Sequence, residues 1–308
     1  MILCTGSNYF GQLGVGSTSS RDNANVPINF GRSDLDPSEV EDIQCGGHFT
    51  VLRFKDGTLQ ACGAVNGTVC PLLTPISLSI PLKCVQVSCG RRHIVALLER
   101  HIVMSWGSGC FGQLGHGDDR SWDSPRIVSF LQPKRLGANV KSVVCGGSHS
   151  GVVTEAGTVY MWGLNRKGQC AQTEDVEYAL LPRLVHSISD YAPDYPSMVA
   201  CGRSHSAAVL MSGRVLMWGE SAFGRLGIPG MKKIQYSPLE LTYFHNLPVA
   251  SIALGDLHSL ALTVEGDVYS WGCNTNGQTG HLMVRLRMPM LLITWALCIP
   301  FFSISLLT

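Results

Sequence analysis

An internal repeat limits the folds open to this chain more than any other feature of its sequence. Five segments of equal length align without a gap, and they begin at Cys45, Cys89, Cys145, Cys201 and Leu254. Most copies are followed by a glycine-rich stretch such as Phe-Gly-Gln-Leu-Gly at residues 111–115, and residues 5–14 match the second half of a further copy. A repeat of this size is one supersecondary unit that buries its apolar face only by stacking on its neighbours.

Each copy is predicted to form a β-hairpin. In the third copy, residues 151–154 and 158–162 are rich in β-branched and aromatic side chains, and they flank Glu155-Ala156-Gly157. Glycine supplies the positive φ of a tight hairpin turn, and it recurs at this position as Gly57, Gly157, Gly213 and Gly266. The second copy has His101 there, which predicts a turn that is built differently.

Short strands with one aromatic residue per copy predict an all-β protein, a β-propeller of about five to six blades. A solenoid of helix pairs is disfavoured, because no stretch of helical length has apolar residues at the 3.6-residue period of an amphipathic helix. The repeated tryptophans are expected to pack between blades; they are Trp106, Trp162, Trp218 and Trp271. Residues 1–280 are assigned to the propeller.

Composition excludes several classes of function. Charged residues make up only 15% of the chain and glycine accounts for 34 of its 308 residues, whereas 45% are hydrophobic, so the chain is expected to fold. The net charge of +1 and the lack of long basic runs do not indicate nucleic-acid binding. The first residues lack the features of a signal peptide, which favours the reducing cytoplasm or nucleus.

The repeated cysteines and histidines are expected to be structural. Cys89, Cys145 and Cys201 each lie in a different copy, so zinc-site spacing is absent and no metal or cofactor is expected. The repeated histidines have no carboxylate at a fixed spacing, which favours a hydrogen-bonding role. Residues 107–112 match Gly-x-Gly-x-x-Gly, the fingerprint of a dinucleotide-binding site. Because no βαβ unit surrounds them, the match is attributed to the glycines of the repeat. No catalytic motif occurs.

The motif Cys-Gly-x-x-His, followed by a hairpin, Trp-Gly and Gly-Gln-Leu-Gly, resembles the repeat of the regulator of chromosome condensation family over residues 1 to about 280. This resemblance implies a seven-bladed propeller. The family's founding member exchanges guanine nucleotide on the Ran GTPase while docked on chromatin, and many relatives use the propeller as a binding module. The copy at Cys45 departs from the motif, with Phe49 at the histidine position and Cys62 at the tryptophan position. With the opening half-copy, six positions correspond to Trp-Gly, so a seven-bladed ring would lack at least one blade and an incomplete ring is expected.

Loops that vary between copies are the candidates for binding a protein partner. The candidate set is Arg91, Arg92, His93, Ser148, His149, Arg203, Ser204, His205, Asp256 and His258. The resemblance implies that the loop Gly255–His258 matches one that contacts the GTPase in the exchange factor. The alternative is that Asp256 is an ordinary polar turn residue. A hairpin insertion and a basic N-terminal tail, which the exchange factor uses, are not found.

A second face is expected to carry the loops that follow Gly-Gln-Leu-Gly. Its candidates for protein contact are Asp118, Asp119, Trp122 and Asp123, because aromatic anchors dominate the energetics of interfaces. The alternative is a solvated loop with Trp122 folded onto the blade.

Residues 281–308 are predicted to be a hydrophobic C-terminal tail. From Met288 to Thr308 the chain carries no charge, which is long enough for a membrane anchor, but Pro289 and Pro300 interrupt the stretch. An aberrant or alternative terminus is favoured over an anchor.

The sequence therefore predicts a non-enzymatic propeller that binds a protein, with a Ran-like small GTPase as the candidate partner. The alternative is a guanine nucleotide exchange factor for such a GTPase. A third hypothesis is a propeller scaffold tethered to a membrane through residues 288–308.

Overall fold

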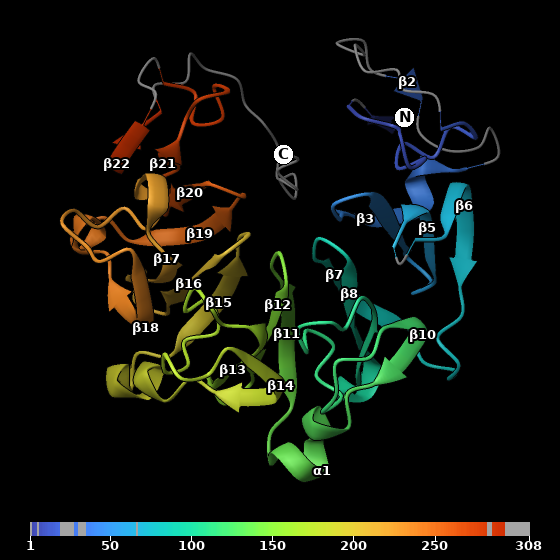
Figure 1. Cartoon of the computed structure of the whole chain (residues 1–308), viewed down its shortest axis with the longest axis horizontal. Helices are drawn as coiled ribbons and strands as arrows, with labels where there is room; N and C mark the ends of the chain where they lie inside the picture. Colours follow the sequence, from blue (N-terminus) through green and yellow to red (C-terminus); the bar gives the residue numbers. More distant parts are fainter. Residues whose placement is uncertain are drawn as a thin grey trace.

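The fold is an open ring of β-sheets around a central axis (Figure 1). The structure, a computed structural model, describes residues 2–4, 6–18, 28–29, 35–65, 67–281 and 285–292. These residues form five four-stranded antiparallel sheets and a two-stranded ladder near the N-terminus. The first and last parts of the described chain lie on opposite sides of the opening (Figure 1). The prediction of an all-β, incomplete propeller is confirmed.

Each blade takes four consecutive strands. The N-terminal ladder pairs β1 (Leu3–Cys4) with β2 (Ile28–Asn29). Blade 1 is β3 (Val40–Cys45), β4 (Phe49–Phe54), β5 (Leu59–Ala64) and β6 (Val69–Ile76). Blade 2 is β7 (Cys84–Cys89), β8 (His93–Leu98), β9 (Val103–Gly107) and β10 (Trp122–Ile127). Blade 3 is β11 (Val140–Cys145), β12 (His149–Thr154), β13 (Val159–Leu164) and β14 (Tyr178–Leu184). Blade 4 is β15 (Pro196–Cys201), β16 (His205–Leu210), β17 (Val215–Glu220) and β18 (Ile234–Glu240), and blade 5 is β19 (Val249–Leu254), β20 (His258–Thr263), β21 (Val268–Cys273) and β22 (Arg285–Leu291).

Helical structure is confined to short turns between strands. The described residues contain one α-helix, α1 (Pro133–Leu136). The 3₁₀ turns are η1 (Pro37–Glu39), η2 (Glu99–His101), η3 (Ser129–Leu131), η4 (His186–Tyr191), η5 (Ala222–Gly224) and η6 (Thr242–Phe244).

The first strand of each blade is the innermost, since β11 contacts β7 and β15, and β15 contacts β19. Two loops of every blade leave from the same end of its sheet, because alternate strands of an antiparallel sheet run in the same direction. In blade 3, His149 at the start of β12 pairs with Gly163 near the end of β13. We call the loops between first and second strands the Cys-Gly loops (46–48, 90–92, 146–148, 202–204 and 255–257). The loops that follow the third strands of blades 2 to 5 are called the Gly-Gln loops (108–121, 165–177, 221–233 and, as far as it is described, 274–281).

The turns between second and third strands lie at the other end of each blade. Gly57, Gly157, Gly213 and Gly266 all have a positive φ there, as predicted. In blade 2 the turn is instead made by Arg100 and His101 with φ of 59° and 60°, so two side-chain-bearing residues occupy the left-handed region. The prediction that this turn is built differently is confirmed.

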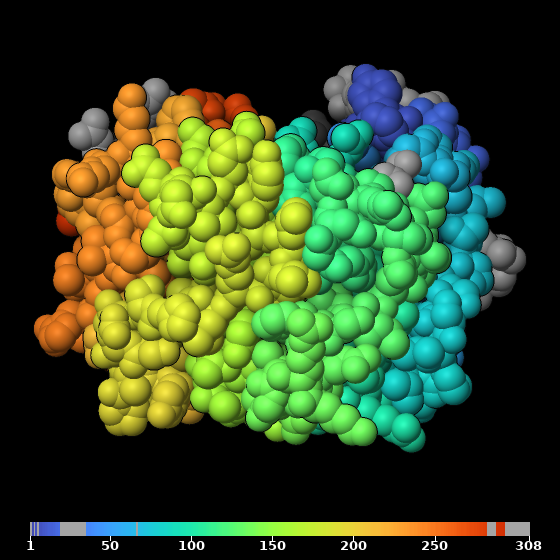
Figure 2. Space-filling model, turned by 60° about the horizontal axis from the view of Figure 1, so that its bottom comes forward, coloured from blue at the N-terminus to red at the C-terminus, as the bar shows by residue number. Residues whose placement is uncertain are grey.

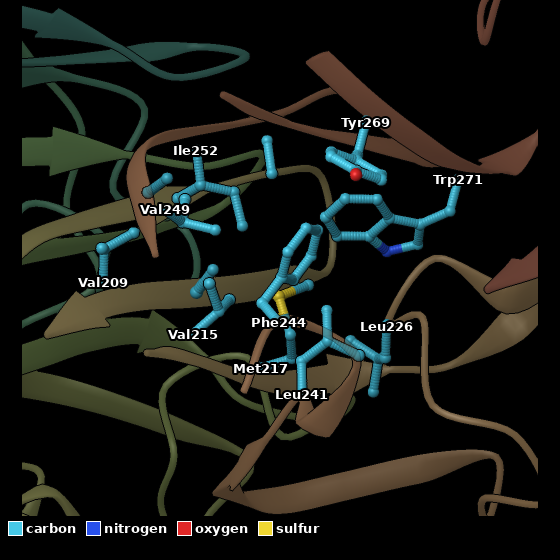
Figure 3. Close-up of a cluster of buried hydrophobic side chains, with 13 residues drawn as sticks. Val209, Val215, Met217, Leu226, Leu241, Phe244, Val249, Ile252, Tyr269 and Trp271 are labelled. Carbon is cyan, nitrogen blue, oxygen red and sulfur yellow. The ribbon is translucent and has the colours of Figure 1, made fainter. Parts of the chain in front are cut away.

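The hydrophobic core lies between neighbouring sheets rather than within any one of them. Met217 of blade 4 packs in one buried cluster with Phe244, Ile252 and Trp271 from the adjoining residues of blade 5 (Figure 3). The space-filling view shows the middle blades lying side by side (Figure 2). The expectation that the repeated tryptophans pack between blades agrees with this arrangement.

Blade 5 takes its fourth strand from the segment predicted as a tail. β22 pairs with β21 in register Ser270↔Met290 and Gly272↔Leu286, so residues 285–291 lie in a blade. No helix within the described ranges is long and apolar enough to span a membrane. The rest of the predicted anchor, residues 293–308, lies outside the described residues.

Candidate protein-binding face

The glycine of each Cys-Gly loop leaves room for the repeated histidine ring. A Cβ atom at Gly146 would lie 2.2 Å from Cε1 of His149, and one at Gly90 would meet His93 in the same way. At Gly46 the contact is with the ring of Phe49, which is 1% exposed. Glycine and an aromatic ring three residues later are therefore required together, and Phe49 takes the histidine position in the first copy.

The repeated histidines link neighbouring blades. Nε2 of His93, His149 and His205 lies 2.8, 2.9 and 3.1 Å from the hydroxyl of Ser150, Ser206 and Ser259 in the next blade. Those three hydroxyls donate in turn to the carbonyl oxygens of Gln113, Gln169 and Arg225 in the Gly-Gln loops. Because each hydroxyl has one proton and gives it to a carbonyl, the histidine Nε2–H is the donor.

Burial keeps these histidines neutral and away from any partner. His93, His149 and His205 are fully buried and His258 is 6% exposed. Desolvation lowers the pKa of His93 to about 4 and that of His149 to about 3, and it also lowers the pKa of His205 and His258. The structure therefore places His93, His149 and His205 in blade joints and buries His258 in the last blade, so none of the four lies on the partner-binding surface to which the candidate set assigned them.

The tryptophan of each regular copy uses the same loop carbonyl. The indole N–H of Trp162, Trp218 and Trp271 donates to the carbonyl oxygens of Gln113, Gln169 and Arg225 at 2.9, 3.0 and 2.9 Å. One Gly-Gln carbonyl thus accepts both a tryptophan and a serine proton from the next blade. The repeated residues therefore form each blade and also the hydrogen bonds that join it to the next one.

The repeated cysteines lie at the inner ends of the first strands. Sγ of Cys145 donates to the carbonyl oxygen of Ser88 at 3.2 Å, and desolvation raises the pKa of its thiol to about 12. Burial also raises the pKa of Cys89 and Cys201. Thiols in this state are poor nucleophiles and poor metal ligands. The described part of the chain holds no group of three or more His, Cys, Asp or Glu that could bind a metal ion.

The Cys-Gly loops surround a hollow of about 210 Å³ at the axis. Backbone hydrogen bonds join successive loops, from Gly47 N to Arg91 O (3.1 Å), from Arg91 N to Gly147 O (3.3 Å), and from Gly147 N to Gly202 O (3.1 Å). The chain of bonds continues from Arg203 N to Gly255 O (3.4 Å). The loops therefore form a preorganised rim, and the side chains that this rim carries differ from blade to blade.

Arginines dominate this rim. Arg91, Arg92 and Arg203 are exposed, while Ser148 and Ser204 are half-buried. The carboxylate of Asp256 is 42% exposed and lies 3.5 Å from the guanidinium of Arg203. The structure thus brings these sequence candidates together on one face, with the acidic residue already paired to a neighbouring loop.

A buried arginine under the rim was missed by the sequence analysis. Arg225 is 2% exposed; its guanidinium donates to the carbonyl oxygen of Asp256 at 3.2 Å and pairs with Glu220 at 3.2 Å. Lys167 also pairs with Glu220, at 3.3 Å. The available signal was the change from Gly-Gln-Leu-Gly to Gly-Arg-Leu-Gly at residues 224–227.

His48 was also missed as a rim residue. It lines the hollow, and its ring lies 4.3 Å from that of Phe10. Burial, followed by the positive charges of Arg91 and Arg92, lowers the pKa of His48. The two arginines therefore favour the neutral ring.

The loop assigned to a second face lies at the same end of the propeller as the Cys-Gly loops. Gly107 pairs with both His93 and Trp122, which puts loop 108–121 beside loop 90–92. The assignment of Asp118, Asp119, Trp122 and Asp123 to a separate face was wrong, because loops that follow the first and third strands of an antiparallel sheet emerge together. Arg126 stacks 3.7 Å over the Trp122 ring, so this tryptophan is folded onto its blade, whereas Asp119 and Asp123 are exposed.

The fold and the repeat chemistry define a β-propeller of the regulator of chromosome condensation type. The chain belongs to the family described as the RCC1-like domain, whose model matches residues 2–294. It is 31% identical over 289 residues to the ultraviolet-B receptor UVR8 of Arabidopsis thaliana, covering 91% of this chain and 62% of that protein. It is 32% identical over 341 residues to human HERC4, a probable E3 ubiquitin-protein ligase, covering 91% of this chain and 31% of that protein.

Solved structures show the same architecture. Yeast RCC1 (Prp20) in its complex with Kap60 superposes with a TM-score of 0.80 at 21% identity, covering 92% of this chain and 69% of that one. Human WBSCR16 superposes with a TM-score of 0.77 at 25% identity, covering 94% and 77%. The chain spans less than two thirds of the length of the two curated relatives.

Proposed function

We propose that this chain is a protein-binding module that recognises an acidic segment of a partner through its Cys-Gly loops. The observation that carries this proposal is that exposed Arg91 and Arg203 line a hollow with a fixed backbone rim, with exposed Arg92 in the same loop as Arg91. Arginine is enriched at protein interfaces, and complementary charge increases the rate and specificity of association. The repeated histidines and cysteines are engaged in the scaffold, so the loops carry the recognition.

The relatives are consistent with a propeller that serves different proteins as a module. By name one is a receptor and another a probable ubiquitin ligase, and yeast RCC1 is bound to Kap60 in its structure. Their differing activities share this repeat, which favours binding over a common chemistry.

Charge reversal on the rim tests the proposal. A partner captured on the immobilised chain is identified by mass spectrometry, purified, and titrated against wild type and the double variant Arg91→Glu/Arg203→Glu. At least a tenfold loss of affinity is expected, with wild-type binding weakening as salt is raised. Lys141→Glu is the matched control, because Lys141 is exposed and lies near the opposite end of its blade. Equal binding by the double variant would contradict the proposed face.

A second candidate function is nucleotide exchange on a Ran-like small GTPase, or another form of its regulation. Asp256 supports it by lying on the rim within a Gly-Asp-x-His loop, and the yeast Prp20p structure is described with its binding properties to Gsp1p and histones. The test is release of a fluorescent guanine nucleotide from Ran. Acceleration that Asp256→Ala abolishes and Asp118→Ala preserves would favour exchange, whereas no acceleration rejects it.

The cytoplasm or nucleus is our proposed location, which imaging of a tagged chain tests. A tether through residues 288–308 is a third, less favoured proposal. A version that ends at residue 292 keeps β22 in blade 5, and its partition into membranes can be compared with that of the full chain. Equal partition would reject the tether and favour an aberrant or alternative terminus.

A further inference from the structure

The joint between blades 1 and 2 lacks a part that the later joints share. β5 ends at Ala64 and β6 begins at Val69, so only residues 65–68 connect them. The corresponding connection in blade 2 runs from 108 to 121 and contains Gly-Gln-Leu-Gly. Blade 2 is therefore packed against a neighbour that supplies no Gly-Gln loop.

The histidine–serine hydrogen bond that links later blades is absent at this joint, because both of its residues are replaced by apolar ones. Phe49 stands where the later copies have histidine, and Ile94 stands where they have serine; both are buried in one cluster. Trp106 is nevertheless retained. Within the described residues, no hydrogen-bond partner is found for its indole nitrogen, whereas the three tryptophans of blades 3 to 5 donate to a loop carbonyl.

A cavity of about 370 Å³ lies at this joint. It is lined by Trp106, Cys62 and Ile76, and by Asp123, Ser124 and Pro125 at the start of β10. At the next joint, the start of β14 is covered by the Gly-Gln loop of blade 2, since a Cβ at Gly112 would lie 2.9 Å from Cα of Leu180. The cavity thus occupies the place that a Gly-Gln loop fills elsewhere.

The filled joints specify what this cavity accepts. In each, a turn that begins at a glycine carries one buried side chain, which is Leu114, Cys170 or Leu226, and one carbonyl oxygen for the tryptophan. Cys170 and Leu226 lie in the same buried cluster as that tryptophan. The turns approach closely, because a Cβ at Gly115 would lie 2.9 Å from the indole nitrogen of Trp162. A leucine side chain with its flanking backbone suits a pocket of this size.

We propose that this cavity is a second binding site, which takes a leucine-containing, glycine-flanked turn from a partner protein. The leucine enters the cavity beside Ile76 and Trp106, and a backbone carbonyl oxygen of the partner accepts the indole N–H of Trp106. The site is separate from the arginine rim and stands independently of the proposed function.

The chain's own loop sequence is the probe. A synthetic peptide with the sequence of residues 108–121, with serine in place of Cys110, is titrated against the full chain by calorimetry. Saturable binding is expected, at least tenfold weaker for a peptide with Leu114→Gly because a buried leucine is lost. Trp106→Phe in the protein is expected to weaken binding about fivefold through loss of one hydrogen bond.

A variant in which a side chain fills the cavity tests whether the peptide binds at this site rather than elsewhere on the protein. Thr74 lines the cavity and is exposed, so Thr74→Trp is expected to fill it and abolish peptide binding, while Thr74→Ser binds as wild type does. If Thr74→Trp fails to fold, residues 108–121 grafted in place of 65–68 provide the same plug. Absence of binding, equal binding by the Leu114→Gly peptide, or binding that survives the plug would overturn the proposal. A chain dimer in sedimentation that the plug dissociates would also overturn it, by showing a second copy as the occupant.

Discussion

Acidification is expected to destabilise this propeller, because its repeated histidines are buried as neutral rings. Burial lowers the pKa of His93 to about 4 and that of His149 to about 3 from an ordinary value of 6.5. Below pH 6.5 the unfolded chain therefore takes up a proton at each ring that the folded chain does not. Stability is complete above pH 6.5 and falls as the pH drops toward the folded pKa.

The size of the effect follows from the two pKa values. Each histidine changes the free energy of unfolding by about 1.4 kcal/mol per pH unit between them. At pH 5, His93 and His149 together remove about 4 kcal/mol, which is a large share of the roughly 5–15 kcal/mol that stabilises a typical domain. His205 and His258 act in the same direction, since burial lowers the pKa of both.

Urea unfolding followed by tryptophan fluorescence between pH 7.5 and 5.0 tests this reasoning. The variant His149→Phe copies the arrangement at Phe49, and its stability should depend on pH less steeply by about 1.4 kcal/mol per unit. His186→Gln is the control, because His186 is exposed and its loss should leave the slope unchanged. The reasoning is refuted if wild-type stability is flat from pH 7 to 5, or if His149→Phe retains the full slope.

Three further predictions concern the blade joints, and urea midpoints check each of them. Trp162→Phe should cost about 1 kcal/mol more than Trp106→Phe, because within the described residues only the first of these two indoles donates to a loop carbonyl; equal costs would contradict this link. Gly146→Ala should cost more than about 2 kcal/mol, since its Cβ would lie 2.2 Å from a buried imidazole. Glu220→Gln should cost roughly 3 kcal/mol by leaving the guanidinium of Arg225 buried without its carboxylate, whereas Arg225→Gln restores the usual repeat residue and should cost under about 1 kcal/mol.

The sequence predicts the fold well because a blade is a local unit. The third copy is expected to be a hairpin over 151–162, and β12 and β13 form it with Gly157 at the turn. The arginine rim is also predictable, because Arg91 and Arg203 precede repeated histidines whose place in the blade is fixed. Such features follow from the period of the repeat and need no knowledge of neighbouring blades.

The end of the propeller at which the acidic loop lies can also be predicted from the sequence, once the order of the strands is considered. Asp118 and Asp119 lie at the end of the propeller that carries the Cys-Gly loops, which follows from counting strands: a loop after a third strand leaves from the same end as one after a first strand. The network of Arg225 and Glu220 could not be predicted from strand order, because Arg225 donates to the carbonyl of Asp256, which belongs to another blade. The spacing of residues along the chain does not predict a contact between Arg225 and a neighbouring blade.

The substitutions at the first joint show how such cross-blade chemistry leaves a trace in the sequence. In blades 2 to 4 each histidine meets a hydroxyl of the next blade, and that hydroxyl donates its proton to a loop carbonyl. Blade 1 has Phe49 and no Gly-Gln loop, and blade 2 correspondingly has Ile94, so a buried unpaired hydroxyl is avoided. Trp106 is the exception to this concerted change. Within the described residues, its indole N–H has no loop carbonyl to match that of the later blades and lies beside a cavity, and a bound turn would supply a carbonyl and fill the cavity.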